Sequence, residues 1–572
     1  MSISSFSVAI TGAGGSGAVT TGLILLESMA HYGFYGLLNR SSGPQIRGGE
    51  SAVFIRFDDQ EVLSVNNHFD YLLALDWFNI ERFIDEIPLG KSSVVIYDSN
   101  AGAIPEVLQK SQAQFMPIDF KTLVKTIHKG RANMIGLGLL AKTISLPFAS
   151  IETSLNKILG RKGADVINTS AQAIRLGMTT QQEAVSWPVR SLATHIEANK
   201  ARWSITGNEA CGLGALKAGV RFVAAYPITP ATEILEWLSP RLEKLGGGLL
   251  QAEDELASIN MIIGASFGGV ASLTATSGPG LSLMLEGIGL AIASETPVVI
   301  INVSRGGPST GIPTKSEQSD LNIALYGCHG DAPHLVLAPL NIADAVTTTF
   351  WATGLAEQLQ TVAIVLCDQF IGQSRAIIDQ VVVPEWETSR VSEKKEHPQN
   401  DYQRYKITEN AVSPMSIPGT PNCLFTADGL EHNSKGIPSS ISQDHIEQLK
   451  KRQDKLLKFD YGAQWAKISG SGDIVLITWG SSSAMVQEAA HTLKQDIKVI
   501  ALRLLMPLPV EALVKALRNS KKVFVIEQNQ GQQLFHYLHS YQSLPVDAHS
   551  FARSGPLPLR PAEIVAFIKE QL

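Results

Sequence analysis

The sequence predicts an α/β protein of three domains, the central one a doubly wound parallel sheet. Apolar runs that suit buried strands alternate with helical runs, most regularly over residues 207–369. The composition is 44% hydrophobic and 17% charged, as expected for parallel strands that are apolar on both faces. The chain of 572 residues is long enough for several domains, since a domain usually has about 150 residues.

The domain boundaries follow from changes in composition. We expect a first α/β domain over residues 1–190, joined by the polar connector SLATHIEANKARW to a second over residues 200–370. Residues 371–459 include a long polar stretch rich in Pro, Ser and Asn, and we expect a loop or linker there. A third α/β domain would occupy residues 460–572.

The expected strands and helices are short runs bounded by turn residues. The strands are expected at residues 6–11, 52–57, 71–75 and 93–98, then at 221–227, 271–276, 297–304, 334–339 and 361–368, and finally at 473–480, 498–505 and 522–528. Helical runs follow residue 18 and occupy residues 132–144, 207–220 and 444–459.

Charge and cysteine content exclude some partners and metal sites. The net charge is −6 without a long basic run, which argues against a nucleic-acid surface. Because the four cysteines are far apart and form no CxxC pattern, we expect no Cys-ligated zinc or iron–sulfur site on this chain. Scattered thiols, no positively charged leader and no convincing membrane span indicate a soluble cytoplasmic protein.

The first domain opens with a strand, the glycine turn GAGGSG and a helix, an arrangement that binds phosphate groups at a helix N-terminus. A dinucleotide site usually has an acid about 20 residues further on, but the stretch HYGFYGLLNRSSGPQIRGGE (residues 31–50) offers none before Glu50. We expect either a tight turn without a ligand or a site for an anionic cofactor such as coenzyme A or a phosphorylated nucleotide. The residues concerned are Gly12, Gly14, Gly15, Gly17, Arg40 and Arg47.

The second domain carries four polar motifs after its apolar runs: YPITP (residues 226–230), QAEDELASI (251–259), ATSGPG (275–280) and SRGGPSTGIPT (304–314). Open α/β sheets bind their ligands at such strand ends. Glu255 opens a helix among these motifs. It is either a catalytic carboxylate or a residue that complements the helix dipole, although Glu253 and Asp254 suit the second role well.

Glu255 and ATSGPG, with Gly264 and Ala265 in the helix between them, resemble the pyrimidine-binding domain of thiamine-diphosphate enzymes. In that superfamily one glutamate hydrogen-bonds the aminopyrimidine ring and promotes the imino tautomer that accepts the thiazolium proton. The resemblance implies this role for Glu255. A carboxylate in a poorly solvated place suits such proton sharing.

YPITP, SRGGPSTGIPT and GNEACGLGALKAGV together resemble the α subunit of 2-oxoacid:ferredoxin oxidoreductases, most closely the 2-oxoglutarate type with its γ domain fused in front. SSGPQIRGGES, SPMSIPGTPN, DGLEHN and LRLLMPLP fit the same family, so the resemblance covers essentially the whole chain. It implies a γ-type α/β domain, a thiamine-diphosphate pyrimidine-binding domain and a C-terminal transketolase-like α/β domain.

The resemblance also implies roles for particular residues. Thr229 would hydrogen-bond the keto acid, and Arg305 would hold its carboxylate through paired donors. Coenzyme A would bind at the glycine turn. The structural alternatives are that Thr229 caps the following helix and that Arg305 pairs with Glu317 or Asp320.

A partner is implied by what the chain lacks. Thiamine-diphosphate enzymes hold the diphosphate through Mg²⁺ on a GDG motif, which is absent here. The family places Mg²⁺ and a [4Fe-4S] cluster on a separate β subunit, with thiamine diphosphate between the chains and an α2β2 heterotetramer as the assembly. The implied reaction is coenzyme A-dependent oxidative decarboxylation of a 2-oxoacid, such as 2-oxoglutarate to succinyl-CoA, with electrons passed to ferredoxin.

Three other functions remain open from the residues alone. The glycine turn and Arg40 fit an NADPH-dependent oxidoreductase that reads a 2′-phosphate. The chain could be a non-catalytic structural subunit of a thiamine-diphosphate enzyme. It could also support non-oxidative thiamine chemistry, which requires no iron–sulfur partner.

Overall fold

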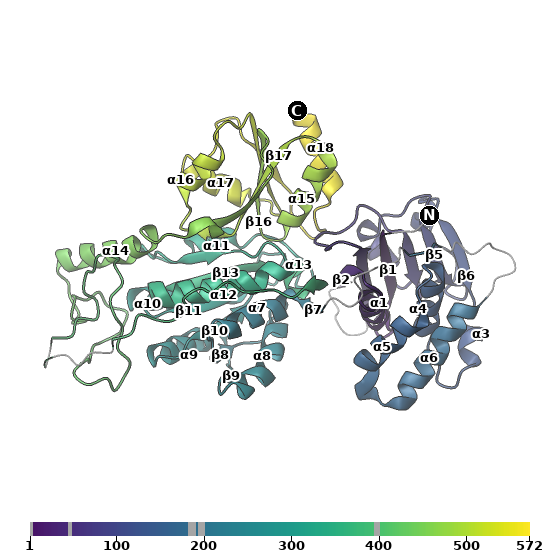
Figure 1. The fold of residues 1–572 in the computed structure, drawn as a ribbon, viewed down its shortest axis with the longest axis horizontal. Coiled ribbons are helices and arrows are strands. Elements are labelled where there is room, and N and C mark those ends of the chain that lie inside the picture. The colour runs from purple at the N-terminus through teal and green to yellow at the C-terminus, as the bar shows by residue number, and fades with distance from the viewer. Residues whose placement is uncertain (1–3, 44–48, 181–189, 193–200, 394–397, 399–400) are drawn as a thin grey trace. The chain divides into compact units, whose positions relative to one another are not determined.

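The computed structural model forms two compact units. The structure describes residues 4–43, 49–180, 190–192, 201–393, 398 and 401–572. The first unit comprises Met1–Thr206, Gln373–Gln380 and Arg560–Ala562, and the second comprises Gly207–Gly372, Val381–Leu559 and Glu563–Leu572. Figure 1 shows the elements of each unit.

The first unit is built on an eight-stranded mixed sheet in the order β6-β5-β4-β1-β3-β2-β14-β7. The strands are β1 (Ser5–Ala13), β2 (Tyr35–Ser42), β3 (Glu50–Asp58), β4 (Tyr71–Ala74), β5 (Val94–Asp98), β6 (Gln114–Ile118), β7 (Arg202–Thr206) and β14 (Arg375–Asp379). β1 pairs parallel with β4 but antiparallel with β3. The four strands expected in this domain are present.

The helices of the first unit pack mainly against one face of this sheet, where α1, α4, α5 and α6 bury their apolar side chains with those of β1, β3 and β4. The helices are α1 (Ala18–Tyr32), α2 (Glu106–Gln109), α3 (Phe120–Lys125), α4 (Ala132–Thr143), α5 (Phe148–Leu159) and α6 (Ala164–Thr179), with short 3₁₀ helices η1 (Ile80–Arg82), η2 (Ile84–Glu86) and η3 (Gly160–Lys162). A smaller cluster, including Phe54, Phe83 and Leu108, covers the other face.

The second unit contains a seven-stranded sheet in the order β18-β12-β13-β11-β10-β8-β9. The strands are β8 (Phe222–Ala225), β9 (Gly248–Gln251), β10 (Ser272–Thr276), β11 (Val298–Ser304), β12 (Leu335–Leu337), β13 (Val362–Asp368) and β18 (Leu504–Met506). All neighbours pair parallel except β12 and β18. The parallel α/β sheet predicted for this region is confirmed.

Seven helices lie among these strands in sequence, from α7 to α13. They are α7 (Gly207–Lys217), α8 (Thr232–Lys244), α9 (Glu255–Phe267), α10 (Gly278–Ala293), α11 (Leu321–Tyr326), α12 (Ile342–Leu359) and α13 (Gln369–Gln373). From β8 the chain moves outward to β9 and then returns past β8 to β10 and β11. Right-handed crossovers in opposite directions place helices on both faces of a sheet, as in a doubly wound fold.

The C-terminal region of the second unit has a five-stranded sheet in the order β15-β17-β16-β19-β20. Its strands are β15 (Ala466–Ser469), β16 (Ile474–Trp479), β17 (Ile497–Leu502), β19 (Lys522–Glu527) and β20 (His549–Ala552), and its helices are η4 (Gly462–Trp465), α15 (Ser482–Leu493), α16 (Val510–Ala516), α17 (Gln533–Ser540) and α18 (Pro561–Gln571). The single strand expected at residues 498–505 is two strands, because the chain leaves this sheet after Leu502 and joins the seven-stranded sheet as β18.

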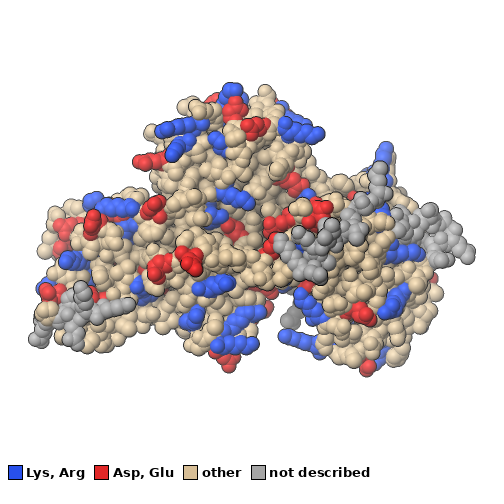
Figure 2. Space-filling view, in the orientation of Figure 1, with Lys and Arg blue, Asp and Glu red and all other residues tan. Residues whose placement is uncertain are grey.

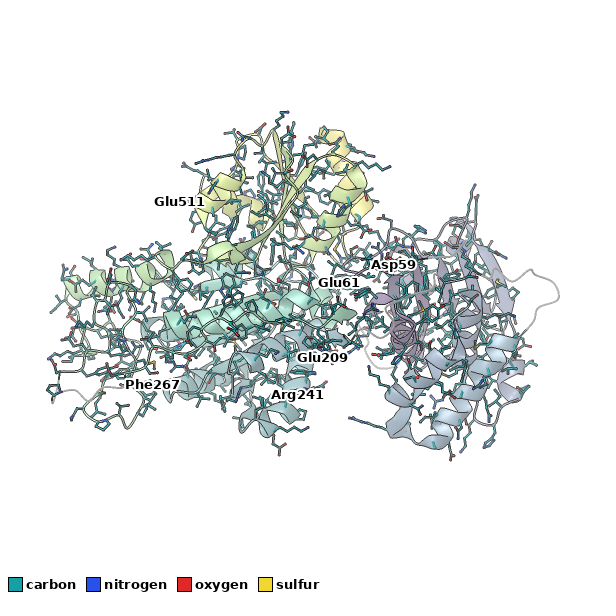
Figure 3. The ribbon with its side chains drawn as sticks, in the orientation of Figure 1. Asp59, Glu61, Glu209, Arg241, Phe267 and Glu511 are labelled. Atoms are coloured by element: carbon teal, nitrogen blue, oxygen red, sulfur yellow. The ribbon has the colours of Figure 1, made fainter. Side chains whose placement is uncertain are left out.

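Residues 380–441 contain no helix or named strand among those that the structure describes, and α14 (Ser442–Leu457) follows. The segment at 375–379, which was expected within a loop, is strand β14, because it pairs with β2 and β7. Phe267 at the end of α9, labelled in Figure 3, packs edge-on against Phe425 with ring centroids 5.5 Å apart. The long segment is therefore packed on the helices of the second unit.

A buried ion cluster also fastens this segment and α14 to the seven-stranded sheet region. The Nζ atom of Lys451 lies 2.6 Å from Glu295 and that of Lys455 lies 3.2 Å away, and all three side chains are buried. Arg404 donates to the main-chain carbonyl of Glu295. Although burial opposes its charge, these cations hold the pKa of Glu295 well below its usual range.

On the face seen in Figure 2, basic and acidic side chains are interspersed over the surface. In the part of the chain that the structure describes, no helix is both long enough and apolar enough to span a bilayer. The described residues also hold no cluster of three or more His, Cys, Asp or Glu side chains placed to bind a metal ion.

Candidate active site

The carboxyl ends of β8 and β10 mark the point at which the direction of winding reverses. Residues 226–230 follow β8, and residues 277–280 follow β10, so the YPITP and SGPG motifs meet at this point of the sheet. Open α/β sheets bind ligands at such switch points, because the chain leaves the two neighbouring strands in opposite directions. The fold thus assembles the motifs at the usual position of a ligand site.

Glu255 is the first residue of α9 and is buried, with 6% of its surface exposed. The preceding Asp254 is the N-cap, and its Oδ1 atom accepts a hydrogen bond from the Ala257 N–H group over 2.7 Å. Asp254 therefore fills the capping role considered for this helix start. The Glu255 carboxylate has no hydrogen-bond partner among the described residues, which leaves a buried acid available to a ligand.

The start of α10 lies directly against Glu255. A Cβ atom at Gly280 would lie 2.0 Å from Thr276 Oγ1 and 2.5 Å from Glu255 Oε1. Only glycine fits there, which explains the last residue of the SGPG motif. Ser277 is the N-cap of α10, but its side chain accepts no capping hydrogen bond, and its buried Oγ atom has no partner among the described residues.

Arg305 follows β11 and is also buried, with 7% exposure. Its Nη1 atom donates to the main-chain carbonyl of Thr229 over 2.6 Å, and its Nε atom has no partner among the described residues. Burial lowers the pKa of the guanidinium from its ordinary value, and the charge of Asp320 acts in the opposite direction. A poorly solvated guanidinium with free donor capacity suits a bound carboxylate.

The structure shows neither of the purely structural roles considered for Thr229 and Arg305, which were helix capping and an ion pair. Helix α8 begins at Thr232 after Ala231, and no side chain caps it. Arg305 forms no ion pair with Glu317 or Asp320 among the described residues. The structure thus brings Thr229 and Arg305 together through a main-chain hydrogen bond.

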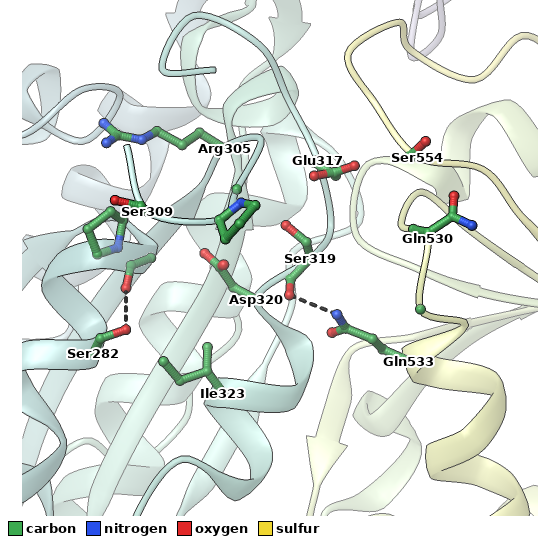
Figure 4. A pocket seen from close by; sticks show the side chains of 15 residues that line it. Ser282, Arg305, Ser309, Glu317, Ser319, Asp320, Ile323, Gln530, Gln533 and Ser554 are labelled. Atoms are coloured by element: carbon green, nitrogen blue, oxygen red, sulfur yellow. Dashed lines mark hydrogen bonds between the residues drawn. The ribbon is translucent and has the colours of Figure 1, made fainter. Parts of the chain in front are cut away.

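A cavity of about 620 Å³ lies beside Arg305, and Asp320 and Glu317 also line it (Figure 4). Gly278 and Pro279 at the start of α10 form one part of its wall, and loops of the C-terminal region form another. Asn302 donates to Asp320 over 2.9 Å, and burial raises the pKa of that carboxyl. The cavity therefore combines a buried cation with one poorly solvated acid.

Several buried polar atoms near these strand ends have no hydrogen-bond partner in the described part of the chain. They are Thr274 Oγ1, Ser277 Oγ, Asn302 Oδ1, Arg305 Nε and Ser319 Oγ. Buried polar groups in proteins are almost always paired. Together with the unpaired Glu255 carboxylate, they fit a site that is completed by a polar ligand such as an aminopyrimidine ring and a 2-oxoacid.

The glycine turn in the first unit joins β1 to α1. Gly12 lies in β1, and Gly14, Gly15 and Gly17 precede the helix, with φ of 94° at both Gly15 and Gly17. The helix has no side-chain cap and no acid in its first turn, so its N-terminal N–H groups lack a built-in anion. Such a helix start fits a phosphate group.

The surroundings of this turn differ in part from the expected anion site. Arg40 lies on β2 and is exposed, and Arg47 lies outside the described residues. Asp76, which sequence analysis did not identify, accepts hydrogen bonds from the Ala13 N–H group over 2.9 and 3.1 Å. The antiparallel pairing of β1 with β3 is also unlike the mostly parallel sheet of dinucleotide folds, which argues against the NADPH interpretation.

Two family models match the chain. One, described as pyruvate ferredoxin/flavodoxin oxidoreductase, matches residues 7–180, and the other, described as the thiamine-diphosphate-binding part of pyruvate flavodoxin/ferredoxin oxidoreductase, matches residues 213–451. The second match contains Thr229, Glu255 and Arg305.

Individual relatives match over most or all of the chain. The α subunit of 2-oxoacid:ferredoxin oxidoreductase 2 from Aeropyrum pernix is 28% identical and covers 99% of this chain and 97% of its own. The 2-oxoglutarate synthase subunit KorA from Methanocaldococcus jannaschii is 36% identical over 57% of this chain and 88% of its own. A solved structure of 2-oxoglutarate:ferredoxin oxidoreductase from Magnetococcus marinus, with 2-oxoglutarate, coenzyme A and succinyl-CoA bound, superposes with a TM-score of 0.90 at 33% identity over 100% of both chains.

Proposed function

The chain belongs to the 2-oxoacid:ferredoxin oxidoreductases, as an α subunit with a fused N-terminal γ-type domain, and from this we propose that it converts 2-oxoglutarate to succinyl-CoA together with a β subunit. The observation that carries the proposal is the buried Glu255 carboxylate, which lacks a partner among the described residues and lies at the switch point of the sheet against Gly280. The 2-oxoglutarate names of two relatives support the choice of substrate.

Thiamine diphosphate, when bound, would supply a nucleophilic carbon for the keto group of the substrate. In our proposal the Glu255 carboxylate holds a proton at the aminopyrimidine ring and so favours the imino tautomer. Its burial keeps water from competing for that hydrogen bond.

Arg305 is proposed to bind the carboxylate at C1 of the 2-oxoacid. Its Nη1 atom is held by the Thr229 carbonyl, which leaves the Nε edge of the guanidinium to face a ligand. The Thr229 hydroxyl is proposed to donate to the keto oxygen. Because the guanidinium is poorly solvated, its attraction for a carboxylate is stronger than in water.

The β subunit is proposed to bring what this chain lacks, namely Mg²⁺ for the diphosphate and a [4Fe-4S] cluster that passes electrons to ferredoxin. An α2β2 heterotetramer is the proposed assembly. Coenzyme A is proposed to bind through its phosphate groups at the Gly14–Gly17 turn, with Arg40 and Arg47 as further contacts. The four cysteines are all free thiols, which supports a reducing, cytoplasmic setting.

The test is Glu255→Gln in the complex reconstituted with the β subunit. Glutamine has the same size but cannot hold the negative charge, so we expect coenzyme A-dependent reduction of a viologen dye to fall by about 10²–10⁴-fold. The exposed Glu253, which precedes the N-cap of the same helix, provides the matched control. Glu253→Gln should leave the rate near that of the parent.

Near-normal decarboxylation by a Glu255→Gln complex that still assembles would refute the catalytic role of Glu255 and favour a structural subunit. Iron and sulfide analysis of the same complex addresses the non-oxidative alternative. A partner without iron and sulfide would refute the transfer of electrons to ferredoxin.

A further inference from the structure

The loop that begins with Arg305 has two arms with different environments. We call residues 305–320 the Arg305 loop, residues 307–311 its outer arm and residues 315–319 its inner arm. Every residue of the outer arm is exposed. The inner arm lies against the C-terminal region of the second unit, and Gln318 within it is fully buried.

Gln318 is hydrogen-bonded through all of its polar groups to two loops of the C-terminal region. Its Nε2 atom donates to the Trp479 carbonyl over 2.9 Å, and its Oε1 atom accepts from the Gln528 N–H group over 2.8 Å. Its own N–H group donates to the Gln528 carbonyl over 2.8 Å, and its carbonyl accepts from Asn529 over 3.3 Å. The Ser482 hydroxyl adds a further hydrogen bond to Oε1.

The neighbours of Gln318 extend the same contact. Glu317 accepts from the Gly555 N–H group over 2.8 Å, and Gln533 donates to the Ser319 carbonyl over 2.9 Å (Figure 4). Three consecutive residues of the inner arm are thus bonded to the C-terminal region. That region, whose five strands form a separate sheet, contributes none of the motifs at the switch point.

Arg305 is connected to the inner arm by a short path. Gly306, the next residue, donates its N–H group to the Lys315 carbonyl over 3.0 Å. At its other end, the Arg305 side chain donates to Thr229. Arg305 is therefore held by the YPITP motif through its guanidinium and by the inner arm through the main chain of the next residue, and no described residue of the outer arm forms a hydrogen bond with the guanidinium.

We propose that Gln318 is a positioning residue, through which the C-terminal region fixes Arg305 for the 2-oxoacid carboxylate. The inference rests on the proposed function, because it assumes that Arg305 binds this carboxylate. In this proposal the C-terminal region, which contains the five-stranded sheet, supports the Arg305 loop. A fully buried amide with both ends bonded defines one position for the inner arm, since any shift would leave polar groups unpaired.

The test measures the KM values for 2-oxoglutarate and for coenzyme A separately in the reconstituted complex. Gln318→Ala should raise KM for 2-oxoglutarate about tenfold, with a smaller change in kcat and no change in KM for coenzyme A. Gln318→Glu keeps the acceptor for Gln528 but places an oxygen against the Trp479 carbonyl, so it should behave like Gln318→Ala. Gln533→Ala, which weakens the same contact at a partly exposed position, should give a smaller effect of the same kind.

Arg503→Ala is the matched control. Arg503 also joins the C-terminal region to the seven-stranded sheet region, through Asp344 at 2.7 Å, but it forms no hydrogen bond or ion pair with the described residues of the Arg305 loop. It should lower Tm without changing KM for 2-oxoglutarate. If Arg503→Ala raises this KM as much as Gln318→Ala does, or if Gln318→Ala and Gln533→Ala both leave it unchanged, the positioning role is refuted.

Arg305→Lys distinguishes the positioning role of Gln318 from the proposed binding of the 2-oxoacid carboxylate by Arg305. If Arg305→Lys raises KM for 2-oxoglutarate and the Gln318 variants do not, only the positioning role fails. If Arg305→Lys leaves KM unchanged, the carboxylate-binding role fails, and the role of Gln318 fails with it.

Discussion

The Nη1 atom of Arg305 donates to the main-chain carbonyl of Thr229 over 2.6 Å, so the loops that follow β11 and β8 are joined directly. Thr229 thereby orients the guanidinium through a backbone atom that side-chain substitution does not remove. Substitutions of Thr229 and Arg305 consequently have separable effects.

We expect Arg305→Lys to lower kcat/KM for 2-oxoglutarate by about 10–100-fold, the usual cost of one charged hydrogen bond. A lysine ammonium has no planar fork and cannot donate to Thr229 and to a carboxylate in the same geometry. Steady-state rates of dye reduction measure the change. Thr229→Ser retains both the carbonyl and the hydroxyl and should remain close to the parent; an equal loss there would contradict this account.

Gly280→Ala should be destabilising by about 1–3 kcal/mol and should reduce activity. Its Cβ atom would collide with Thr276 Oγ1 and displace Glu255. Gly289→Ala in the same helix is the control, since a Cβ atom there meets nothing within 4 Å. That substitution should stabilise the helix by up to about 1 kcal/mol. Urea unfolding of both variants gives the sign of each effect, and a neutral Gly280→Ala would show that α10 can shift freely.

Glu295→Gln should destabilise the protein by about 3–5 kcal/mol, because it leaves buried cations without their anion. Lys451, Lys455 and Arg404 all contact Glu295. The free energy of unfolding from urea titration provides the measurement. The exposed Glu286 on α10 is a suitable control, and Glu286→Gln should be close to neutral. Equal stabilities for the two variants would mean that the cluster adds nothing to the attachment of α14.

The stability that Glu431 contributes should disappear in acid. Glu431 accepts hydrogen bonds from Arg452 at 2.8 and 3.1 Å and contacts His445 at 2.7 Å. Although burial opposes its charge, these partners lower the pKa of Glu431 from the ordinary 4.5. As pH falls below 4.5, the unfolded chain therefore takes up a proton before the folded protein does, and stability decreases.

The Tm difference between the parent and Glu431→Gln should accordingly be largest at neutral pH and should shrink as pH falls below 4.5. A constant difference across this range would show that the ion pairs of Glu431 do not contribute to folding.

Gly15→Ala should raise KM for coenzyme A and leave KM for 2-oxoglutarate unchanged. Gly15 has φ of 94°, and a Cβ atom there would project into open space, where the proposed phosphate groups would lie. Gly163→Ala is matched to it, because Gly163 has φ of 92° and an equally open environment at the start of α6. Both substitutions strain the backbone, so an effect on coenzyme A shared by both variants would point to strain alone.

Much of the fold was predictable from local sequence. Every strand expected in the first unit and in the seven-stranded sheet is present, because strands buried on both faces are continuous apolar runs. Strands β2, β6, β7, β9, β14, β15 and β20 were missed, and two of them show why. Tyr35–Ser42 ends in polar residues, and Arg375–Asp379 is a strand only because it pairs with β2 and β7, which lie far away in sequence.

The site residues that lie within sequence motifs were predictable. Thr229, Glu255 and Arg305 were identified because the motifs that contain them resemble those of a known family, and their roles stay predictions until they are tested. Gln318 carries no comparable signal. Its partners are 161 and 210 residues away in sequence, and a glutamine near a charged loop usually indicates an exposed surface. Asp76, which holds the glycine turn from 63 residues away, was missed for the same reason.

Strand β18 belongs to the seven-stranded sheet but lies in sequence between β17 and β19 of the five-stranded sheet, so no single cut in the chain separates the two sheets. The chain completes the seven-stranded sheet only at Met506, after three strands of the other sheet have been formed. A chimera with a related α subunit that is joined near residue 460 would therefore pair β12 of one parent with β18 of the other. A junction after Met506 instead would divide the five-stranded sheet. In functional recombinants between relatives, residues 207–559 are thus expected to come from a single parent.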